Sequence, residues 1–261
     1  MAKKRRRDRK REATTDRGGS RRGAARPTSP QTITAARLVT SLLDLLKAVG
    51  ARAALAVILV ELPLVVITLV GDPTGMIAVF YGLVAIVGSA AAIHIALEHV
   101  GGRPSPSMPR ALRVGVSSWL GLLAAGIFAG LIVLFFGLLL IVPGVLRALS
   151  YAMISPLVVS GECYGVDALE ESRRRMRGHR LQALWAYVAV FLPMILWQGL
   201  YLAIFGAQRA FGTGAELPPL STAERTLDAF FNVLYPLFDL PVTLLAVVLY
   251  SEVPRPAADR T

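Results

Sequence analysis

The stretch from Pro143 to Arg180, PGVLRALSYAMISPLVVSGECYGVDALEESRRRMRGHR, contains the two kinds of segment that recur along the chain. An apolar run opened by Pro-Gly is followed by a short connection, a charged amphipathic segment and the start of the next apolar run. Apolar runs joined by basic connections are typical of polytopic membrane proteins, because about 20 apolar residues cross a bilayer as a helix. The stretch therefore indicates an all-α membrane bundle.

The composition of the whole chain agrees with this class. Of its 261 residues, 54% are hydrophobic and only 17% are charged. Six apolar runs have the length of membrane spans, and they cover residues 53–70, 76–97, 114–142, 145–160, 181–205 and 227–250. The sequence thus predicts a six-span membrane domain at 32–252, with a basic tail at 1–31 and a short tail at 253–261.

The distribution of basic residues predicts the orientation. Residues 1–31 carry twelve Lys and Arg against three Asp and Glu, and the connections 98–113 and 161–180 together with the carboxyl tail hold nearly all the other loop arginines. Basic segments stay on the cytoplasmic side of a membrane. We therefore expect both termini inside (N-in/C-in), a break at Pro143-Gly144 on the outside, and a multi-pass protein of a bacterial inner membrane.

The basic tail has no apolar periodicity and is rich in Arg, Gly, Ser and Pro, which predicts disorder. Its favoured role is a cytoplasmic topology signal that also contacts anionic lipid headgroups. A nucleic-acid arm or a localisation signal is the alternative. Residues 1–31 contain no aromatic side chain for base stacking, so nucleic acid is the less favoured partner.

Two amphipathic helices are predicted at the cytoplasmic interface. The first covers Thr32 to Gly50, where apolar residues recur at helical spacing, and leads into the first span. These residues are Ile33, Leu38, Leu42, Leu45, Leu46 and Val49. The second runs from Ala168 to Arg177 and is expected to anchor the protein between the fourth and fifth spans.

The second amphipathic helix carries several local signals. Asp167, with Glu170 three residues later, has the spacing of a capping box, and Gly178 suits a left-handed stop. Glu170–Arg174 and Glu171–Arg175 are pairs at i,i+4. A thin apolar stripe of Leu169, Ser172 and Met176 is expected to rest on the bilayer surface or on the spans.

Charged residues inside the predicted spans are the candidate functional groups. Glu61 precedes a proline in the first span, Asp239 lies midway along the sixth, and Arg147 closely follows the Pro-Gly break. A charge at this depth is costly and marks a functional group by default. One hypothesis is a proton or ion path through Glu61 and Asp239; the other is that each is protonated or hydrogen-bonded to backbone carbonyls that the prolines leave free.

No motif for catalysis, metal binding or a cofactor is found. His94, Glu98 and His99 form H-x-x-x-E-H, which matches neither the H-E-x-x-H zinc motif nor its inverse, so a polar helix end is the favoured interpretation. Cys163 is the single cysteine and has no histidine nearby in the sequence. We expect no enzymatic activity and no cofactor.

The stretch resembles a signature of a bacterial six-span membrane-protein superfamily, which includes the membrane domain of glycerophosphoryl diester phosphodiesterases and families of unknown function. The matching residues are Pro143, Gly144, Pro156, Ala168, Leu169, Ser172, Arg177 and Gly178, and the Leu249-Tyr250 ending also fits. Where the pattern has an arginine near position 150, this chain has Ser150, with Arg147 one turn earlier. The resemblance implies the membrane architecture; it implies no hydrolase activity, because no segment the size of the catalytic barrel is present.

The sequence therefore predicts a non-enzymatic accessory, scaffolding or envelope-related membrane component. Its expected partners are the lipid bilayer, anionic headgroups, and a second membrane protein or a second copy of the chain. A small transporter or channel that uses Glu61 and Asp239 is the alternative.

Overall fold

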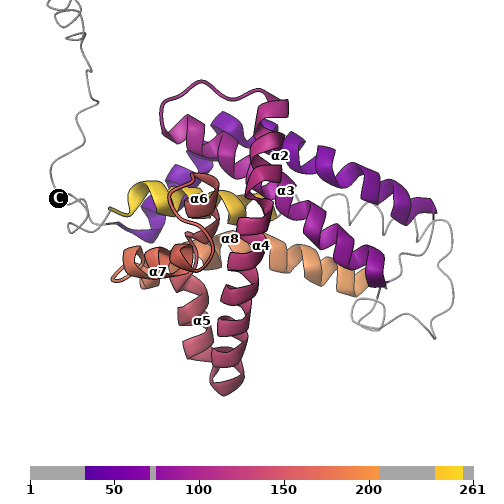
Figure 1. Cartoon of the computed structure of the whole chain (residues 1–261). Coiled ribbons are helices and arrows are strands. Elements are labelled where there is room, and N and C mark those ends of the chain that lie inside the picture. The colour runs from indigo at the N-terminus through magenta and orange to yellow at the C-terminus, as the bar shows by residue number, and fades with distance from the viewer. Residues whose placement is uncertain (1–32, 71–74, 206–238, 255–261) are drawn as a thin grey trace, which may run out of the picture. The chain divides into compact units, whose positions relative to one another are not determined.

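The computed structural model describes residues 33–70, 75–205 and 239–254, and within them every regular element is a helix. In chain order the helices are α2 (Ala35–Val70), α3 (Gly75–Val100), α4 (Met108–Leu139), α5 (Ile141–Ser150), α6 (Ile154–Val159), α7 (Val166–Arg175) and α8 (Arg180–Phe205). Residues 239–252 form a further helix near the carboxyl end, drawn in yellow in Figure 1. The all-α prediction is confirmed for this part of the chain.

Four of the described helical segments are long and apolar enough to cross a membrane: Gly82–Val100, Met108–Leu139, Ile141–Val159 and Arg180–Ala203. They correspond to the second, third, fourth and fifth predicted spans. The predicted tail at 1–31, the connection 206–225, the first half of the sixth span (227–238) and residues 255–261 lie outside the described residues, as do 71–74 of the first turn.

The first predicted span and the interfacial helix before it are one continuous helix, α2, of 36 residues. The predicted boundary at Gly50 is wrong, because the apolar stripe of the first half is buried against the rest of the protein and the helix continues through the glycine. The buried stripe consists of Leu38, Leu42, Leu45 and Val49.

Small residues let the first three long helices approach closely. A Cβ placed on Gly88 of α3 would lie 3.2 Å from the Cα of Val57 in α2. One placed on Gly115 of α4 would lie 2.5 Å from the carbonyl oxygen of Val87 in α3. Trp119 secures the same α3–α4 contact, since its indole N–H donates to the Leu83 carbonyl at 2.8 Å. Close packing over small residues is characteristic of helices in membranes.

Helices α4 and α5 form a hairpin that projects from the other helices (Figure 1). The chain turns at Leu140, which is extended with φ −160° and ψ 132°, and α5 begins at the next residue. The predicted break at Pro143-Gly144 is therefore wrong by three residues. Pro143 lies in the first turn of α5, where its missing N–H breaks no helical hydrogen bond.

The fourth predicted span, 145–160, is interrupted. Helix α5 ends at Ser150, and α6 begins at Ile154 after a turn at residues 151–153. The interior of the molecule lies around this turn, where side chains from distant parts of the sequence meet. The largest fully buried ones are Leu38, Ile93, Ile95, Met153, Leu157, Met176, Leu244, Leu245 and Leu249.

Candidate functional site

Helix α7 carries a buried charged residue, Arg175, and two glycines with positive φ lie near its ends. Gly165, at φ 55°, precedes the first helical residue, and Gly178, at φ 87°, follows the last turn. The predicted Asp167 cap is wrong, since the helix begins at Val166 and Asp167 lies inside its first turn without a capping hydrogen bond. The residue at the cap position is Gly165, which has no side chain to accept from the first turn.

Ser172 fastens α7 to the turn between α5 and α6. Its hydroxyl donates to the carbonyl of Ser150 at 2.9 Å and accepts from the backbone N–H of Met153 at 3.1 Å. These are backbone groups that the interrupted helix leaves without a helical partner. The Ser172 hydroxyl therefore gives a hydrogen-bond partner to one backbone group on each side of the turn.

The residues beside Ser172 on α7 are buried with it. Ala168 and Ser172 are 0% exposed, Leu169 is 5% exposed and Met176 is 0% exposed. The predicted stripe of Leu169, Ser172 and Met176 thus rests on the protein and not on the bilayer surface. Ala168, Leu169 and Ser172 therefore form the docking face of this helix.

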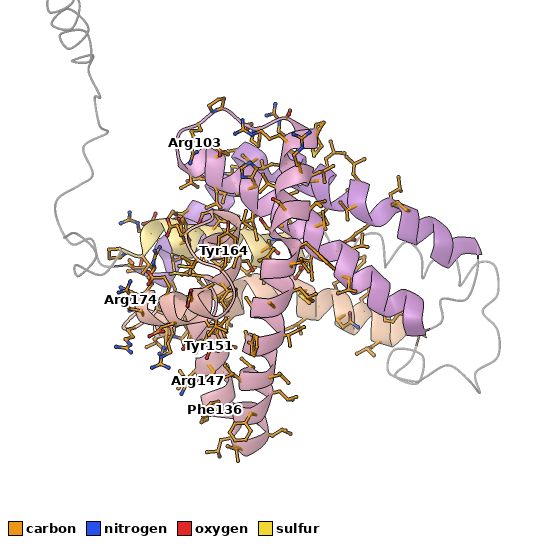
Figure 2. All side chains as sticks on the ribbon, in the orientation of Figure 1. Arg103, Phe136, Arg147, Tyr151, Tyr164 and Arg174 are labelled. Carbon is orange, nitrogen blue, oxygen red and sulfur yellow. The ribbon has the colours of Figure 1, made fainter. Side chains whose placement is uncertain are left out.

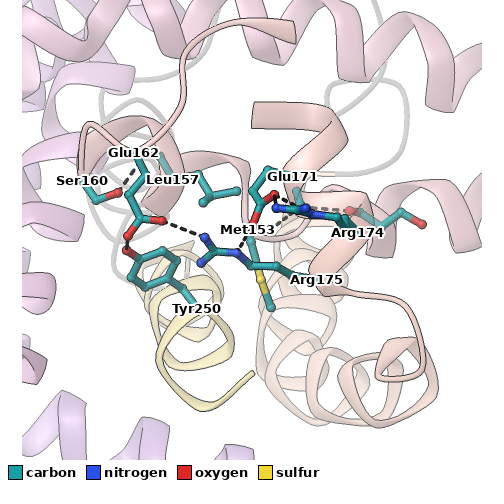
Figure 3. Close-up of polar contacts among 10 residues, drawn as sticks. Met153, Leu157, Ser160, Glu162, Glu171, Arg174, Arg175 and Tyr250 are labelled. Atoms are coloured by element: carbon teal, nitrogen blue, oxygen red, sulfur yellow. Dashed lines mark hydrogen bonds and ion pairs between the residues drawn. The ribbon is translucent and has the colours of Figure 1, made fainter. Parts of the chain in front are cut away.

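Arg175 is the buried centre of a group that we call the α7 polar cluster: Glu162, Glu171, Arg174, Arg175 and Tyr250 (Figure 3). The side chain of Arg175 is 5% exposed. Its Nε donates to Glu171 at 2.5 Å, its Nη2 donates to Glu162 at 2.8 Å, and its guanidinium carbon lies 5.5 Å from the centre of the Tyr250 ring. The Tyr250 hydroxyl donates to the second oxygen of Glu162.

The cluster is balanced in charge and joins three segments. Arg174 also pairs with Glu171, at 2.5 Å, so two arginines face two carboxylates. Burial lowers the pKa of Arg175, but its hydrogen bonds to Glu171 and Glu162 outweigh this effect and raise the pKa above its usual value. The predicted Glu171–Arg175 pair at i,i+4 is confirmed. Helix α7, the 160–165 connection and the C-terminal helix are held together by these contacts.

Cys163 lies next to the α7 polar cluster and is half-buried. Burial raises the pKa of its thiol, and the charges of Glu171, Glu162 and Asp167 raise it further, while Arg175 opposes them. The thiolate is the nucleophilic form of cysteine. At a given pH, a raised pKa leaves a smaller fraction of Cys163 as thiolate.

A second polar contact joins the start of α2 to the end of the C-terminal helix. Arg37 pairs with Glu252 at 2.9 Å, and the hydroxyl of Ser41 donates to the same carboxylate at 3.3 Å. The C-terminal helix is thus held at Tyr250 by the α7 polar cluster and at Glu252 by α2. No local sequence pattern indicates these contacts, since Ser41 and Glu252 are 211 positions apart.

The three predicted intramembrane charges occupy different surroundings. Glu61 is buried in α2, with 7% of its surface exposed. Arg147, on α5, lies over the ring of Phe136 on α4, with 4.6 Å from the guanidinium carbon to the ring centre (Figure 2). Asp239 is half-buried and is the first described residue of the C-terminal helix. Arg147 thus makes a cation–π contact within the hairpin.

Three other residues of the resemblance lie at a helix contact, in the core and on the surface. A Cβ on Gly144 would lie 2.7 Å from the Cα of Gly137, so α4 and α5 approach each other closely at Gly144. Pro156 is fully buried in α6. Arg177 is exposed in the turn that ends α7.

The H-x-x-x-E-H pattern does not form a metal site in the described residues, which contain no group of three metal-ligating side chains. Glu98 instead pairs with Arg103 in the next connection, at 3.1 Å. Nε2 of His94 is buried without a hydrogen-bond partner.

Comparisons of the chain with models of known protein families, with curated proteins and with solved structures found no match.

Proposed function

We propose that the chain is an integral membrane protein whose apolar helices face lipid. The supporting observation is that two long apolar helices are hardly covered by the rest of the described chain. Only 6% of the most apolar window within Met108–Leu139 and 11% of that within Arg180–Ala203 is buried. Apolar surface of this extent is not left in water by soluble proteins. A hydrocarbon environment stabilises it.

The proposed orientation places both termini in the cytoplasm of a bacterium. It rests on the basic residues of 1–31, 98–113 and 161–180, all of which fall on one side in an N-in/C-in arrangement. Membrane fractionation tests the membrane location. The protein should stay in the pellet after washing with alkaline carbonate, whereas release into the supernatant would show that it is only peripheral.

The proposed molecular role is that of a non-enzymatic accessory or scaffolding component related to the cell envelope. The α7 polar cluster supports this role, because its charges are paired with one another and hold segments together. Arg173 and Arg177 remain exposed on the same helix and the turn that ends it. These arginines, with the basic tail, are suited to anionic headgroups or to an acidic surface of a membrane partner.

A liposome experiment tests the lipid part of this role. Protein reconstituted in neutral lipid should bind added vesicles that contain anionic lipid, and the binding should weaken with salt. Deletion of residues 1–31 should remove most of it, and Arg173→Gln with Arg177→Gln should reduce the rest. Equal binding to neutral vesicles would contradict the electrostatic contact.

A small transporter is the second candidate, and the burial of Glu61 at 7% exposure in an apolar helix favours it. Buried carboxylates in membrane helices commonly belong to ion or proton pathways. In liposomes, Asp239→Asn and Glu61→Gln should then abolish proton- or ion-coupled flux while the protein stays folded. Unchanged flux in both variants would leave the accessory role as the better account.

A further inference from the structure

The corner between α7 and α8 carries three arginines that no carboxylate neutralises. Arg173 and Arg177 are exposed, and Arg180, the first residue of α8, is half-buried. Within the described residues none of the three forms an ion pair, unlike the two arginines between them, which belong to the α7 polar cluster. The corner therefore has positive charge that is open to an anion.

Arg180 is held in place and yet lacks an acceptor. Its Nε is buried, and no hydrogen-bond partner for it lies in the described part of the chain. A guanidinium has only donors, so it needs oxygen acceptors from outside the protein when the protein supplies none. Because Arg180 as a whole is only half-buried, such an oxygen can approach it. A side chain that is already partly fixed loses less freedom on binding than an exposed arginine does.

An exposed apolar face of α8 begins directly after Arg180. Four apolar side chains at helical spacing are 48–61% exposed. These side chains are Leu181, Trp185, Val188 and Leu192. On the other side of the helix, Ala183 and Ala186 are fully buried, so the apolar face is the one turned away from the protein.

The cationic corner and the apolar face match the two parts of a phospholipid. Arginine binds phosphate oxygens through paired N–H groups. Leu181 follows Arg180 in the chain, and Trp185 lies one turn further, about 6 Å along the helix axis. Tryptophan is enriched where a helix passes from the headgroups into the hydrocarbon. A phosphate beside Arg180 therefore leaves its acyl chains next to side chains that suit them.

We propose that the α7–α8 corner binds an anionic phospholipid of the adjacent leaflet, with its phosphate on Arg177 and Arg180 and its acyl chains along Leu181 and Trp185. This proposal rests on the proposed membrane location of α8. It assigns the general attraction to anionic headgroups a particular site. In the other basic connection, 98–113, Arg103 is instead paired with Glu98.

Thermal unfolding of the full chain in neutral detergent, with defined lipids added, tests the site. A ligand that binds only the folded chain raises the unfolding midpoint. Phosphatidylglycerol should raise the midpoint by several degrees, whereas phosphatidylcholine and inorganic phosphate at the same concentration should not. An equal shift with inorganic phosphate would show a site for phosphate alone, and an equal shift with phosphatidylcholine would show no selection for charge. Either result overturns the proposal.

Substitutions locate the bound lipid. Arg180→Gln should lose most of the shift, and its midpoint without lipid should not fall, because the substitution removes a donor that has no acceptor. Arg113→Gln is the matched control, since Arg113 is exposed near the start of another apolar helix, α4, and it should keep the shift. Equal losses in the two variants would indicate diffuse attraction and overturn the site. A lower midpoint without lipid and an unchanged shift in Arg180→Gln would show a purely structural role, with the same consequence.

Arg177→Gln provides a second test that does not depend on the folding of Arg180→Gln, because Arg177 is exposed. This variant should also reduce the shift, and a full shift would remove Arg177 from the site. A second copy of the chain is the other possible cover of the apolar face. In vesicles, Trp185→Cys in a Cys163→Ser chain should form no disulfide between chains, and efficient crosslinking would overturn the lipid site. Failure of the membrane location is distinguishable, since carbonate would then release the protein.

Discussion

At the scale of single residues, the small side chain of Ser172 holds α7 against the turn between α5 and α6. Replacement by Ala leaves the Met153 N–H and the Ser150 carbonyl buried without a partner. The expected loss is about 1–3 kcal/mol of unfolding free energy, measured by thermal or denaturant unfolding in detergent. Ser160→Ala is the matched control, because that hydroxyl donates to the Leu157 carbonyl from an exposed position at the end of α6. Equal losses for the two variants would contradict the anchoring role.

Arg175→Gln should be more damaging. It leaves Glu162 and Glu171 close together in a partly buried site without the charge that pairs them, and removing one partner of a buried pair costs about 3 kcal/mol or more. We expect faster proteolysis within 161–180 and a lower unfolding midpoint. Arg173→Gln, at an exposed position of the same helix, should change neither. A wild-type cleavage pattern in Arg175→Gln would show that the cluster does not hold α7.

Cys163 provides a prediction about pH. Because burial raises the pKa of its thiol, a smaller fraction of Cys163 is thiolate near pH 7 than in an unperturbed cysteine. Alkylation by a small maleimide should therefore be slower at pH 7 than that of a free thiol, and the rate should keep rising above the pH at which a free thiol is fully ionised. Asp167→Asn should speed the reaction slightly, since Asp167 contributes to the raised pKa. A rate equal to that of a free thiol at pH 7 would contradict this.

The residue scale also shows what a single sequence can reveal. The Glu171–Arg175 pair follows from i,i+4 spacing and could be predicted. The contacts of Glu162 with Arg175 and Tyr250 could not, because they join three segments whose proximity is set by the packing of the whole domain. In the sequence, Leu249-Tyr250 is only part of a resemblance. In the structure, Tyr250 donates a hydrogen bond to Glu162.

At the scale of elements, Gly144 controls the α4–α5 hairpin. Gly144→Ala places a methyl group 2.7 Å from the Cα of Gly137, so the helices must separate. We expect a loss of about 1–3 kcal/mol, as for other overpacked sites, measured as a lower unfolding midpoint in detergent. Gly137→Ala is a close control, since its Cβ would meet no atom within 4 Å. Similar midpoints for both variants would show that the contact is not important.

The helices themselves were predictable where apolar runs are long and uninterrupted, as at α8, whose observed bounds match the predicted fifth span within one residue. Errors occurred where two local signals competed. Pro-Gly suggested a break at 143, but proline is compatible with the first turn of a helix, so the chain turns before it. Asp167 suggested a cap, but Gly165 adopts the positive φ that begins the helix earlier.

At the scale of the whole molecule, the contact between α2 and the C-terminal helix joins distant parts of the chain. A double-mutant cycle of Arg37→Gln and Glu252→Gln should give a coupling of about 0.5–1 kcal/mol, since the pair is partly exposed. The same cycle for Lys47 and Asp44, which are 3.8 Å apart with side chains 79% and 80% exposed, should give no measurable coupling. Equal couplings would show that the Arg37–Glu252 pair contributes nothing to the fold.

The membrane class and the all-α fold could be inferred at this scale, because composition and run length depend little on packing. The interruption of the apolar run 145–160 could not, because the turn between α5 and α6 is held by the hydrogen bonds of Ser172, which is a tertiary interaction.

The attachment of the C-terminal helix has a consequence for biosynthesis. Arg37 and Arg175 are synthesised well before their partners Glu252 and Tyr250. Until those partners are made, α2 and α7 each lack one stabilising contact. A chain truncated before residue 250 should therefore insert into the membrane but be cleaved faster by proteases than the full chain.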